Sequence, residues 1–458
     1  MNKYSIKNIS GWGCTNLKIC RIYTTTNYLD LHNKYEVLEN CETIITRGLG
    51  RSYGDAAVNG GEGVIVMTGL NRMLSFNSQT LELECEAGVC LGEILNHFAP
   101  RGYFLPVVPG TKFVTVGGAI ANDIHGKNHH RDGTFSNYVN HMRILMANGD
   151  VVECSPSDNN DLFWSTVGGI GLTGIILTAR IQLIRIPSAY MEVDYQYCGD
   201  LDEILAMMTA TDKNYAYSVA WVDCLARGKH LGRGILMQGN HAIPGKLPDK
   251  LRTMPFKAKS HTINLPVQFP NWALNSWSVK VFNSLYSTLN RMKSREYEPY
   301  EAFFFPLDSI QNWNRMYGKQ GFGQYQATFP YENVDGLVKL FEKLSQSRRA
   351  SFLAVLKSFG SSGNGLLSYP FPGFTLALDL PNRDNLSGFM RSLDAILLDY
   401  GGRIYTAKDF STDAATFAVM YPRFDEFLAL KEQFDPENRF SSSMSRRLGL
   451  TPALKGDK

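Results

Sequence analysis

The sequence lacks the signatures of several common classes of protein. None of its eight cysteines forms a Cys-x-x-Cys pair. His129 and His130 are adjacent and would point apart on a helix or strand, so no metal site is expected. No run of about 18 apolar residues occurs, which argues against a membrane-spanning helix. The first ten residues have no apolar segment of the kind a secretory signal needs.

Charge and composition narrow the class further. A net charge of +3 on 458 residues is too small to favour binding to nucleic acid. With 44% hydrophobic and 19% charged residues, the chain is typical of a globular protein of about two or three domains. A chain of this length does not need disulfides, so we expect the cysteines to be reduced thiols, mostly in the core, of a cytoplasmic protein.

A glycine- and arginine-rich stretch, residues 47–55, is the strongest local signal. It reads Arg-Gly-Leu-Gly-Arg-Ser-Tyr-Gly-Asp and follows a β-branched run, residues 43–46, that predicts a buried strand. Glycines let backbone N–H groups approach an anion, and arginine suits phosphate. The stretch predicts a pyrophosphate cradle, although its spacing is neither the dinucleotide fingerprint nor the P-loop. A surface glycine turn is the alternative interpretation.

Two further glycine-dense stretches strengthen the first interpretation. Residues 106–130 contain Pro-Gly-Thr, Val-Thr-Val-Gly-Gly-Ala-Ile and His-Gly-Lys-Asn-His-His, and residues 167–176 contain Gly-Leu-Thr-Gly-Ile-Ile. Three such loops suggest one long cofactor that lies across several of them. Beyond residue 188 the glycine-loop pattern disappears, and aromatic residues and methionine become frequent.

Local patterns predict several individual elements. Residues 91–98, 201–209, 334–347 and 386–400 predict helices, and residues 175–186 predict one long strand. Asn148-Gly149 predicts a two-residue hairpin turn. From about residue 189 to 403, alternating strands and helices predict an antiparallel sheet with helices on one face.

Together, these motifs resemble the PCMH-type FAD-binding fold of the vanillyl-alcohol-oxidase superfamily. Within it, the chain looks most like the decaprenylphosphoryl-β-D-ribose oxidase family, nearly end to end. The resemblance implies an α+β fold with a discontinuous FAD-binding domain, residues 1–188 and 404–458. Between its two parts, residues 189–403 would form a substrate domain of antiparallel sheet plus helices.

The resemblance also implies which residues bind the cofactor. They come from the three glycine loops and from a C-terminal motif, and they are Arg47, Gly48, Leu49, Gly50, Arg51, Ser52, Tyr53, Gly54, Pro109, Gly110, Thr111, Thr115, Val116, Gly117, Gly118, Ala119, Asn122, Asp123, His125, Gly126, Asn128, Gly171, Gly174, Ile176, Tyr405 and Lys408. Related flavoproteins often bind FAD covalently through a histidine of the first loop. Arg51 takes that place here, so we expect non-covalent FAD.

Two further sets of residues follow from the resemblance. It implies Lys408, His125 and Tyr53 as catalytic residues, although a lone lysine is ordinarily a surface residue. It implies as substrate-binding residues Lys127, Trp221, Gln324, Gln326, Lys357, Thr375 and Ala377. Gln324 and Gln326 alternate on a predicted strand, so both amides should face the same side, where they could bind sugar hydroxyls or form a polar outer face.

Thr375 and Ala377 depart from the family pattern. The family has asparagine and cysteine at these two positions, before an aspartate that corresponds to Asp379. No thiol is present at that place, so covalent trapping by a cysteine-directed electrophile should fail. Hydride transfer does not need the thiol, but the substrate is less closely defined.

The expected activity is FAD-dependent oxidation of a CH–OH group. The substrate would be a polyprenyl-phosphate-linked pentofuranose, whose 2′-hydroxyl becomes a ketone. A separate short-chain NAD(P)H reductase would complete an epimerisation. A soluble sugar, alditol or aldonolactone oxidase is one alternative, and a catalytically inactive flavin-binding module is another.

Residues 255–289 have little periodicity and several aromatic residues, namely Phe269, Trp272, Trp277 and Phe282. They predict a long irregular excursion, which is uncommon without a function. One hypothesis is peripheral contact with the inner membrane. Packing between domains is the other.

Overall fold

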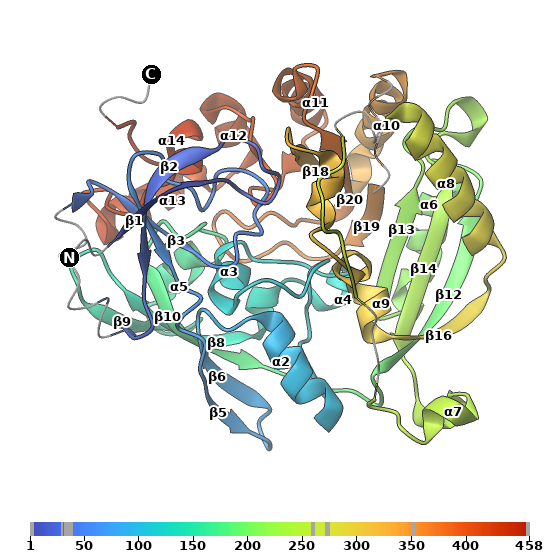
Figure 1. Ribbon diagram of the computed structural model, residues 1–458, viewed down its shortest axis with the longest axis horizontal. Helices are drawn as coiled ribbons and strands as arrows, with labels where there is room; N and C mark the ends of the chain where they lie inside the picture. The colour runs from blue at the N-terminus through green and yellow to red at the C-terminus, as the bar shows by residue number, and fades with distance from the viewer. Residues whose placement is uncertain are drawn as a thin grey trace.

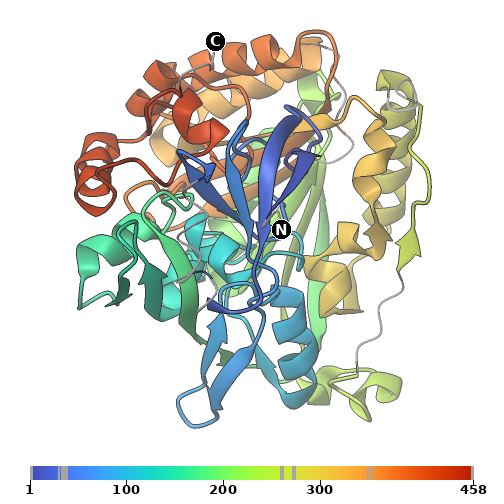
Figure 2. The ribbon, with the colours of Figure 1, turned by 60° about the vertical axis from the view of Figure 1, so that its left-hand side comes forward.

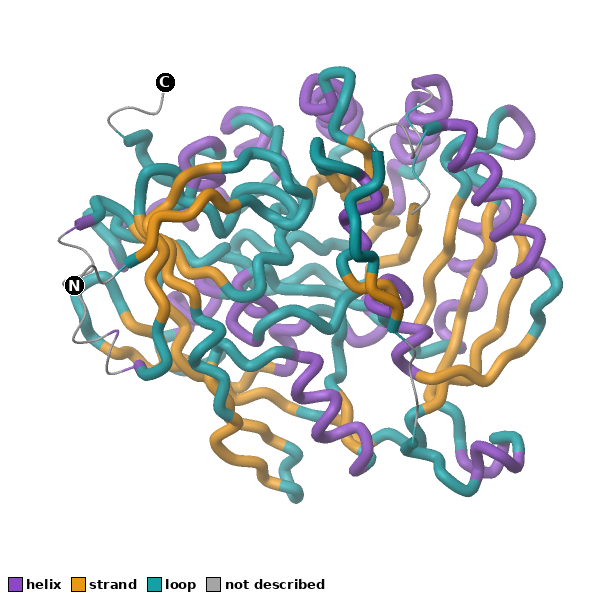
Figure 3. The backbone as a smooth tube through the Cα atoms, viewed as in Figure 1, coloured by secondary structure: helices purple, strands orange, loops and turns teal. Residues whose placement is uncertain are grey.

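The structure is a computed structural model that describes residues 4–28, 31, 40–257, 262–270, 275–347, 349, 351 and 354–454. Its elements form two smaller sheets built from the N-terminal part of the chain and one large sheet from the middle part (Figure 1). Loops fill the space between these sheets (Figure 3). The mixed α+β class agrees with the prediction.

The first sheet has the order β1-β2-β4-β3, with bounds β1 Ser5–Ile9, β2 Lys18–Thr24, β3 Ile44–Arg47 and β4 Gly63–Val66. β4 runs parallel to both β2 and β3. β3 is the strand predicted ahead of the glycine–arginine stretch, and the irregular chain between β3 and β4 carries that stretch.

The second sheet is antiparallel, with the order β5-β6-β10-β8-β9. Its strands are β5 Met73–Asn77, β6 Glu82–Glu86, β8 Val139–Leu145, β9 Val151–Cys154 and β10 Ile175–Gln182. Asn148-Gly149 lies in the β8–β9 hairpin as predicted, but Met146 N–H donates to Asp150 O, so the loop is longer than two residues. The predicted strand 175–186 is interrupted, because β11 (Ile184–Arg185) pairs with β7 (Tyr103–Phe104) instead.

Short helices lie in the chain between β6 and β10 of the second sheet, with bounds α2 Leu91–Phe98, α3 Val116–Ala121, α4 His129–Asp132 and α5 Asn160–Thr166. α2 confirms its prediction. α3 begins where the Thr115 hydroxyl accepts from Gly118 N–H, which caps the helix. A Cβ on Gly117 would lie 3.0 Å from Ala87, so glycine allows α3 to pack closely on its neighbour.

The large sheet is antiparallel throughout, with the order β16-β12-β14-β13-β19-β20-β18-β21. The bounds are β12 Tyr190–Cys198, β13 Tyr217–Val222, β14 Gly234–His241, β16 Arg295–Pro299, β18 Phe322–Pro330, β19 Ala354–Phe359, β20 Gly373–Pro381 and β21 Arg403–Ile404. β15 (Ile263–Asn264) and β17 (Ile310–Gln311) form a separate parallel pair.

Helices pack on both faces of this sheet, not on one. α6 (Leu201–Thr211), α10 (Asp335–Ser347) and α11 (Leu386–Asp399) share one core with Ala220 and Val222. Trp221 alternates with those residues and instead contacts Tyr286 of α8 (Ser276–Arg291), with ring centroids 4.8 Å apart. The single-face prediction is therefore wrong for α8.

α8 also corrects the prediction of an irregular excursion over residues 255–289. From Ser276 the segment is helical, because Asn275 caps the helix by accepting from two backbone N–H groups of its first turn. Residues 258–261 and 271–274, and with them Trp272, lie outside the described residues.

The remaining helices are α7 (Asp249–Arg252), α9 (Tyr300–Phe304), α12 (Ala414–Met420), α13 (Phe424–Phe434) and α14 (Ser443–Arg447). The C-terminal helices lie beside the first sheet in both ribbon views (Figures 1 and 2). Ile44 N–H donates to Arg439 O at 2.7 Å, and Arg447 pairs with Asp55 at 2.6 Å and Asp409 at 2.8 Å. The domain boundaries at 188/189 and 403/404 stay a prediction.

Other whole-chain features bear on the class of protein. In the part of the chain that the structure describes, no helix is long and apolar enough to cross a bilayer. The same residues contain no group of three or more His, Cys, Asp or Glu that could hold a metal ion. All eight cysteines are free, and most of them are buried, as expected.

Candidate active site

A large cavity lies where the glycine loops meet the large sheet, with about 1750 Å³ of empty space including its open mouth. We call the lining residues of loops 46–57, 109–122 and 170–176 the loop wall. We call the residues that β18, β19 and β20 contribute, namely Gln324, Gln326, Val355, Lys357 and Ala377, the strand wall. His125, Tyr405 and Lys408 also line the cavity.

Most of the predicted cofactor residues line this cavity. Besides His125, Tyr405 and Lys408, they are Gly48, Leu49, Gly50, Arg51, Ser52, Tyr53, Pro109, Gly110, Thr111, Thr115, Gly117, Gly118, Asn122, Gly171, Gly174 and Ile176. The structure thus brings together three loops that are far apart in sequence, as a long cofactor requires.

The other predicted cofactor residues lie behind the lining, namely Arg47, Gly54, Val116, Ala119, Asp123, Gly126 and Asn128. The Arg47 guanidinium donates to Ser10 O at 2.8 Å and Ala57 O at 3.0 Å, so its charge holds the loop and does not enter the cavity. Asp123 accepts from Ser368 Oγ at 2.5 Å, and burial raises the pKa of its carboxyl.

Glycine is required at particular points of the loop wall. A Cβ on Gly48 would lie 2.2 Å from the Thr115 hydroxyl oxygen. At Gly171 the backbone has φ +81°, which side chains other than glycine rarely adopt. Gly110 differs, because a Cβ there would meet no atom within 4 Å; its backbone faces the open cavity.

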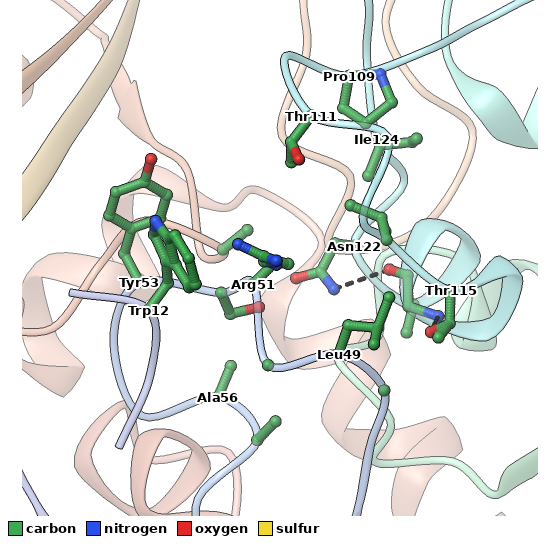
Figure 4. A pocket seen from close by; sticks show the side chains of 18 of the residues that line it. Trp12, Leu49, Arg51, Tyr53, Ala56, Pro109, Thr111, Thr115, Asn122 and Ile124 are labelled. Atoms are coloured by element: carbon green, nitrogen blue, oxygen red, sulfur yellow. Dashed lines mark hydrogen bonds between the residues drawn. The ribbon is translucent and has the colours of Figure 1, made fainter. Parts of the chain in front are cut away.

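Three cavity-lining side chains carry a buried polar atom without a hydrogen-bond partner among the described residues, namely Arg51 Nε, Asn122 Oδ1 and His125 Nδ1. Arg51 lies over the Trp12 ring at 3.8 Å, and burial lowers the pKa of its guanidinium. In Figure 4 Arg51 lies between Trp12 and Asn122. Buried polar atoms normally have partners, so these atoms and the glycine backbone fit a large polar ligand such as FAD.

Several lining residues were missed from sequence, among them Trp12, Asp308 and Trp313. Trp12 N–H donates to Ser52 O at 2.8 Å, which fixes the tryptophan against the first glycine loop. Its position between Gly11 and Gly13 was a usable signal. Asp308, which accepts from the Thr111 hydroxyl at 2.7 Å, comes from a distant segment and carries no local signal.

Lys408 lines the cavity and is half-buried, with Nζ 4.0 Å from the Tyr53 ring centroid. Burial lowers the pKa of its amine to about 7. Gln324 Nε2 donates both to the Tyr53 hydroxyl, at 3.2 Å, and to Asp379 Oδ1. Burial raises the pKa of the Asp379 carboxyl to about 7. Near neutral pH this site can therefore exchange a proton.

The predicted substrate residues divide into two groups. Gln324, Gln326, Lys357 and Ala377 line the cavity. The Tyr325 hydroxyl points to the other side of β18 and donates to Asp394 at 2.8 Å, which confirms that the two glutamines share a face. Burial lowers the pKa of Lys357 to about 8.

Lys127, Trp221 and Thr375 do not line the cavity. The Lys127 amine donates to Phe303 O and lies over the Phe303 ring, and burial lowers its pKa to about 7. Trp221 packs against α8. Thr375 lies behind Gln326, within hydrogen-bond distance of Tyr369.

Comparison with known proteins defines the class and then the family. Residues 36–155 match the family model of an FAD-binding domain, and residues 379–448 match that of D-arabinono-1,4-lactone oxidase. The chain is therefore an FAD-dependent oxidoreductase that acts on a hydroxyl group. It is 40% identical to the decaprenylphosphoryl-β-D-ribose oxidase of Mycolicibacterium smegmatis, over 97% of this chain and 98% of that protein. The chain belongs to the decaprenylphosphoryl-β-D-ribose oxidase family.

More distant relatives have other names. An uncharacterised protein of Streptomyces coelicolor is 32% identical over 77% of this chain and 97% of its own length. The L-gulonolactone oxidase of Mus musculus is 22% identical over 86% of this chain and 87% of its own length.

Proposed function

We propose that the protein oxidises the 2′-hydroxyl of a polyprenyl-phosphate-linked pentofuranose to a ketone. The main support is that a cavity with flavin-type glycine loops on one wall carries two amides and a lysine on the other. The amide nitrogens of Gln324 and Gln326 already donate within the protein, so their amide oxygens offer acceptors to sugar hydroxyls, and Lys357 offers a cation to the phosphate. The end-to-end likeness to a relative named for this type of sugar points the same way.

The reaction removes a hydroxyl proton and a hydride from one carbinol. Bound FAD supplies the acceptor for the hydride. Lys408 would take the proton, because its amine, with a pKa lowered to about 7, is largely unprotonated in mildly alkaline solution. Tyr53, against which Lys408 rests, would keep the amine in place.

FAD would be held without a covalent bond. Among the described residues that line the cavity there is no cysteine, and the one histidine, His125, has its ring held among Phe359, Tyr369 and Tyr405. Acid precipitation should release the yellow colour into the supernatant. Colour retained in the pellet would contradict non-covalent binding.

A soluble sugar, alditol or aldonolactone oxidase is the second candidate. The match of residues 379–448 to a lactone-oxidase model favours it, and so does the likeness to L-gulonolactone oxidase. A flavin-binding module without catalysis is the third. The lowered pKa of Lys408 inside the cavity argues against it, because a merely structural lysine has no need of that environment.

Anaerobic stopped-flow reduction of the flavin separates the three. Polyprenyl-phosphoryl ribose, ribose 1-phosphate, free alditols and aldonolactones would each be mixed with the yellow protein. We expect rapid bleaching by the lipid-linked sugar and at least about a hundredfold slower bleaching by free sugars, which lack the phosphate that Lys357 would bind. Equal or faster bleaching by a lactone would favour the second candidate, and no bleaching by any compound the third.

The ketone would be consumed by a separate short-chain NAD(P)H reductase, which would complete an epimerisation. A hydride delivered to the opposite face of the 2′-carbon inverts that centre. Incubating both proteins with lipid-linked ribose should yield the arabino epimer. Return of the ribo sugar only would contradict this partner.

The outer face of α8 supports a contact of the protein with the cytoplasmic side of a membrane. Trp277, Leu285 and Leu289 are 74%, 59% and 66% exposed on the face opposite the sheet. Lys280, also exposed, lies on the same helix, whereas the Arg291 guanidinium lies over the Tyr197 ring of β12. Apolar side chains beside a lysine suit an anionic bilayer, and each buried apolar side chain adds about 1.5–3 kcal/mol. Figure 1 draws α8 on the outside of the large sheet.

Flotation with vesicles tests this contact. The wild type should float with phosphatidylglycerol-containing vesicles and less with pure phosphatidylcholine. The triple variant Trp277→Ser, Leu285→Ser, Leu289→Ser should stay behind, whereas the control Leu398→Ser, Val419→Ser, which alters exposed residues of α11 and α12, should float. Unchanged flotation of the triple variant, or a wild-type oligomer that the triple variant breaks into monomers, would argue for packing against protein instead.

A further inference from the structure

A chain of buried polar side chains runs behind the strand wall and ends at His125. The Thr328 hydroxyl donates to the Tyr369 oxygen at 2.6 Å, and Tyr369 lies 2.8 Å from the Thr375 hydroxyl oxygen. Gln326 Nε2 donates to Thr375 at 3.4 Å and lies 2.9 Å from His125 Nε2. All five side chains are buried.

The end of this chain fixes the ring proton of His125. Whichever of Tyr369 and Thr375 donates to the other, the Thr375 hydroxyl oxygen has a lone pair left for the Gln326 amide nitrogen. That nitrogen carries only protons to donate, so His125 Nε2 must accept, and the ring proton must be on Nδ1.

The other nitrogen of the ring is left for a ligand. His125 Nδ1 is buried without a hydrogen-bond partner among the described residues, and the residue lines the cavity. Burial, followed by the positive charge of Lys357, lowers the pKa of His125 well below its usual value. A second proton on the ring is therefore disfavoured.

We propose that Gln326, oriented by Thr375, holds His125 as the neutral Nδ1–H tautomer, so that His125 donates a hydrogen bond to the molecule bound in the cavity. Gln326 and Thr375 are positioning residues in this arrangement. His125 has no free lone pair toward the ligand and does not serve as the base, which leaves the proton to Lys408. The inference rests on the proposed function only in taking this cavity as the active site; the tautomer does not depend on which sugar binds.

The tautomer can be measured without turnover. Protein labelled with ¹⁵N-histidine and loaded with FAD would be studied by long-range ¹H–¹⁵N correlation, with His125 assigned by the loss of its signal in His125→Gln. We expect a protonated-type Nδ1 and an unprotonated-type Nε2, unchanged down to pH 5. A protonated-type Nε2 in this range, as the other tautomer or as imidazolium, would overturn the proposal.

Two variants test what sets the tautomer. Gln326→Glu places only acceptors beside Nε2, so the proton should move to Nε2 and the pKa of His125 should rise. Thr375→Val removes the hydroxyl that orients the amide, so both tautomers should be detected. Gln320→Glu makes the same chemical change at an exposed loop position and should alter nothing.

Flavin content and thermal unfolding would show whether each variant is folded. If Gln326→Glu does not fold, the tautomer populations of Thr375→Val alone test the positioning role. The pH profile provides a second readout. In Gln326→Glu a titration of His125 should add a new limb below pH 7, which Thr375→Val and the control should lack. Wild-type tautomer populations in both variants would overturn the positioning role.

Discussion

The loop wall and the strand wall of the cavity are built in different ways. The loop wall presents backbone, and its shape depends on glycines such as Gly48, where a Cβ would meet Thr115. The strand wall presents side chains, such as Gln324 and Lys357, from neighbouring strands of a regular antiparallel sheet. Backbone amides suit a constant cofactor, whereas side chains on a fixed sheet can change with the substrate without disturbing the fold.

The largest effect is expected at Lys408. This residue lies in neither wall, and we expect it to act in the reaction between the cofactor and the substrate. Lys408→Met removes the amine that accepts the proton, so flavin reduction should slow by about 10²–10⁴-fold. Stopped-flow reduction would measure the rate, and absorbance of the bound flavin would measure loading. The exposed Lys339→Met on α10 is the control. A Lys408→Met protein that keeps the wild-type rate would remove this residue from the reaction.

Gly110 isolates the contribution of the loop wall. An added Cβ would meet no protein atom, so Gly110→Ala should leave the stability of the flavin-free protein within about 0.5 kcal/mol of wild type. If the cofactor occupies that space, the methyl group should weaken FAD binding by about 1–2 kcal/mol, roughly tenfold.

Calorimetric titration of the flavin-free protein would give the affinity, and thermal unfolding the stability. Gly245→Ala is the matched control, since a Cβ there also meets nothing within 4 Å, in an exposed turn of 3-10 helix. Equal FAD affinity in the two variants would mean that the cofactor does not approach Gly110.

The two walls also differ in how far the sequence predicts them. The loop wall was recognised because glycine spacing and its flanking arginine are local signals. The strand alternation of Gln324 and Gln326 was predicted for the same reason. Asp308 and Trp313 were not, because they enter the cavity from chain that is adjacent only after folding.

The direction of individual side chains was the second feature that the sequence did not predict. Lys127 belongs to a recognisable motif, yet its amine turns to the carbonyl of Phe303, a contact that depends on α9 packing nearby. The helical form of residues 276–291 was missed, although Asn275 just before it is a typical N-cap residue and was a usable local signal.

The pH dependence of flavin reduction tests the protonation state of Lys408, which lies between the two walls in function but belongs to neither. The rate should rise as pH increases through about 7, because the Lys408 amine must lose its proton before it can accept one. The nearby Asp379 carboxylate favours the charged amine, so Asp379→Asn should lower the pKa of Lys408 and move the limb to lower pH. Stopped-flow rates between pH 5.5 and 9 would test this. A limb that moves to higher pH would contradict the assignment to Lys408.

Introduced thiols provide the mildest test of the two walls. No native cysteine lines the described cavity, so a cysteine-directed electrophile should not label the wild type there. Ala377→Cys adds a thiol to the strand wall and should react while FAD is bound. The rate of flavin reduction should change less than about tenfold, since the sulfur enters open space and not packed core.

Ala57→Cys adds a thiol to the loop wall. This thiol should be protected by bound FAD and react once the flavin is removed. Peptide mass mapping would locate the label. Protection of both thiols by FAD would show that the cofactor covers the strand wall as well, and the division of the cavity into two binding walls would then fail.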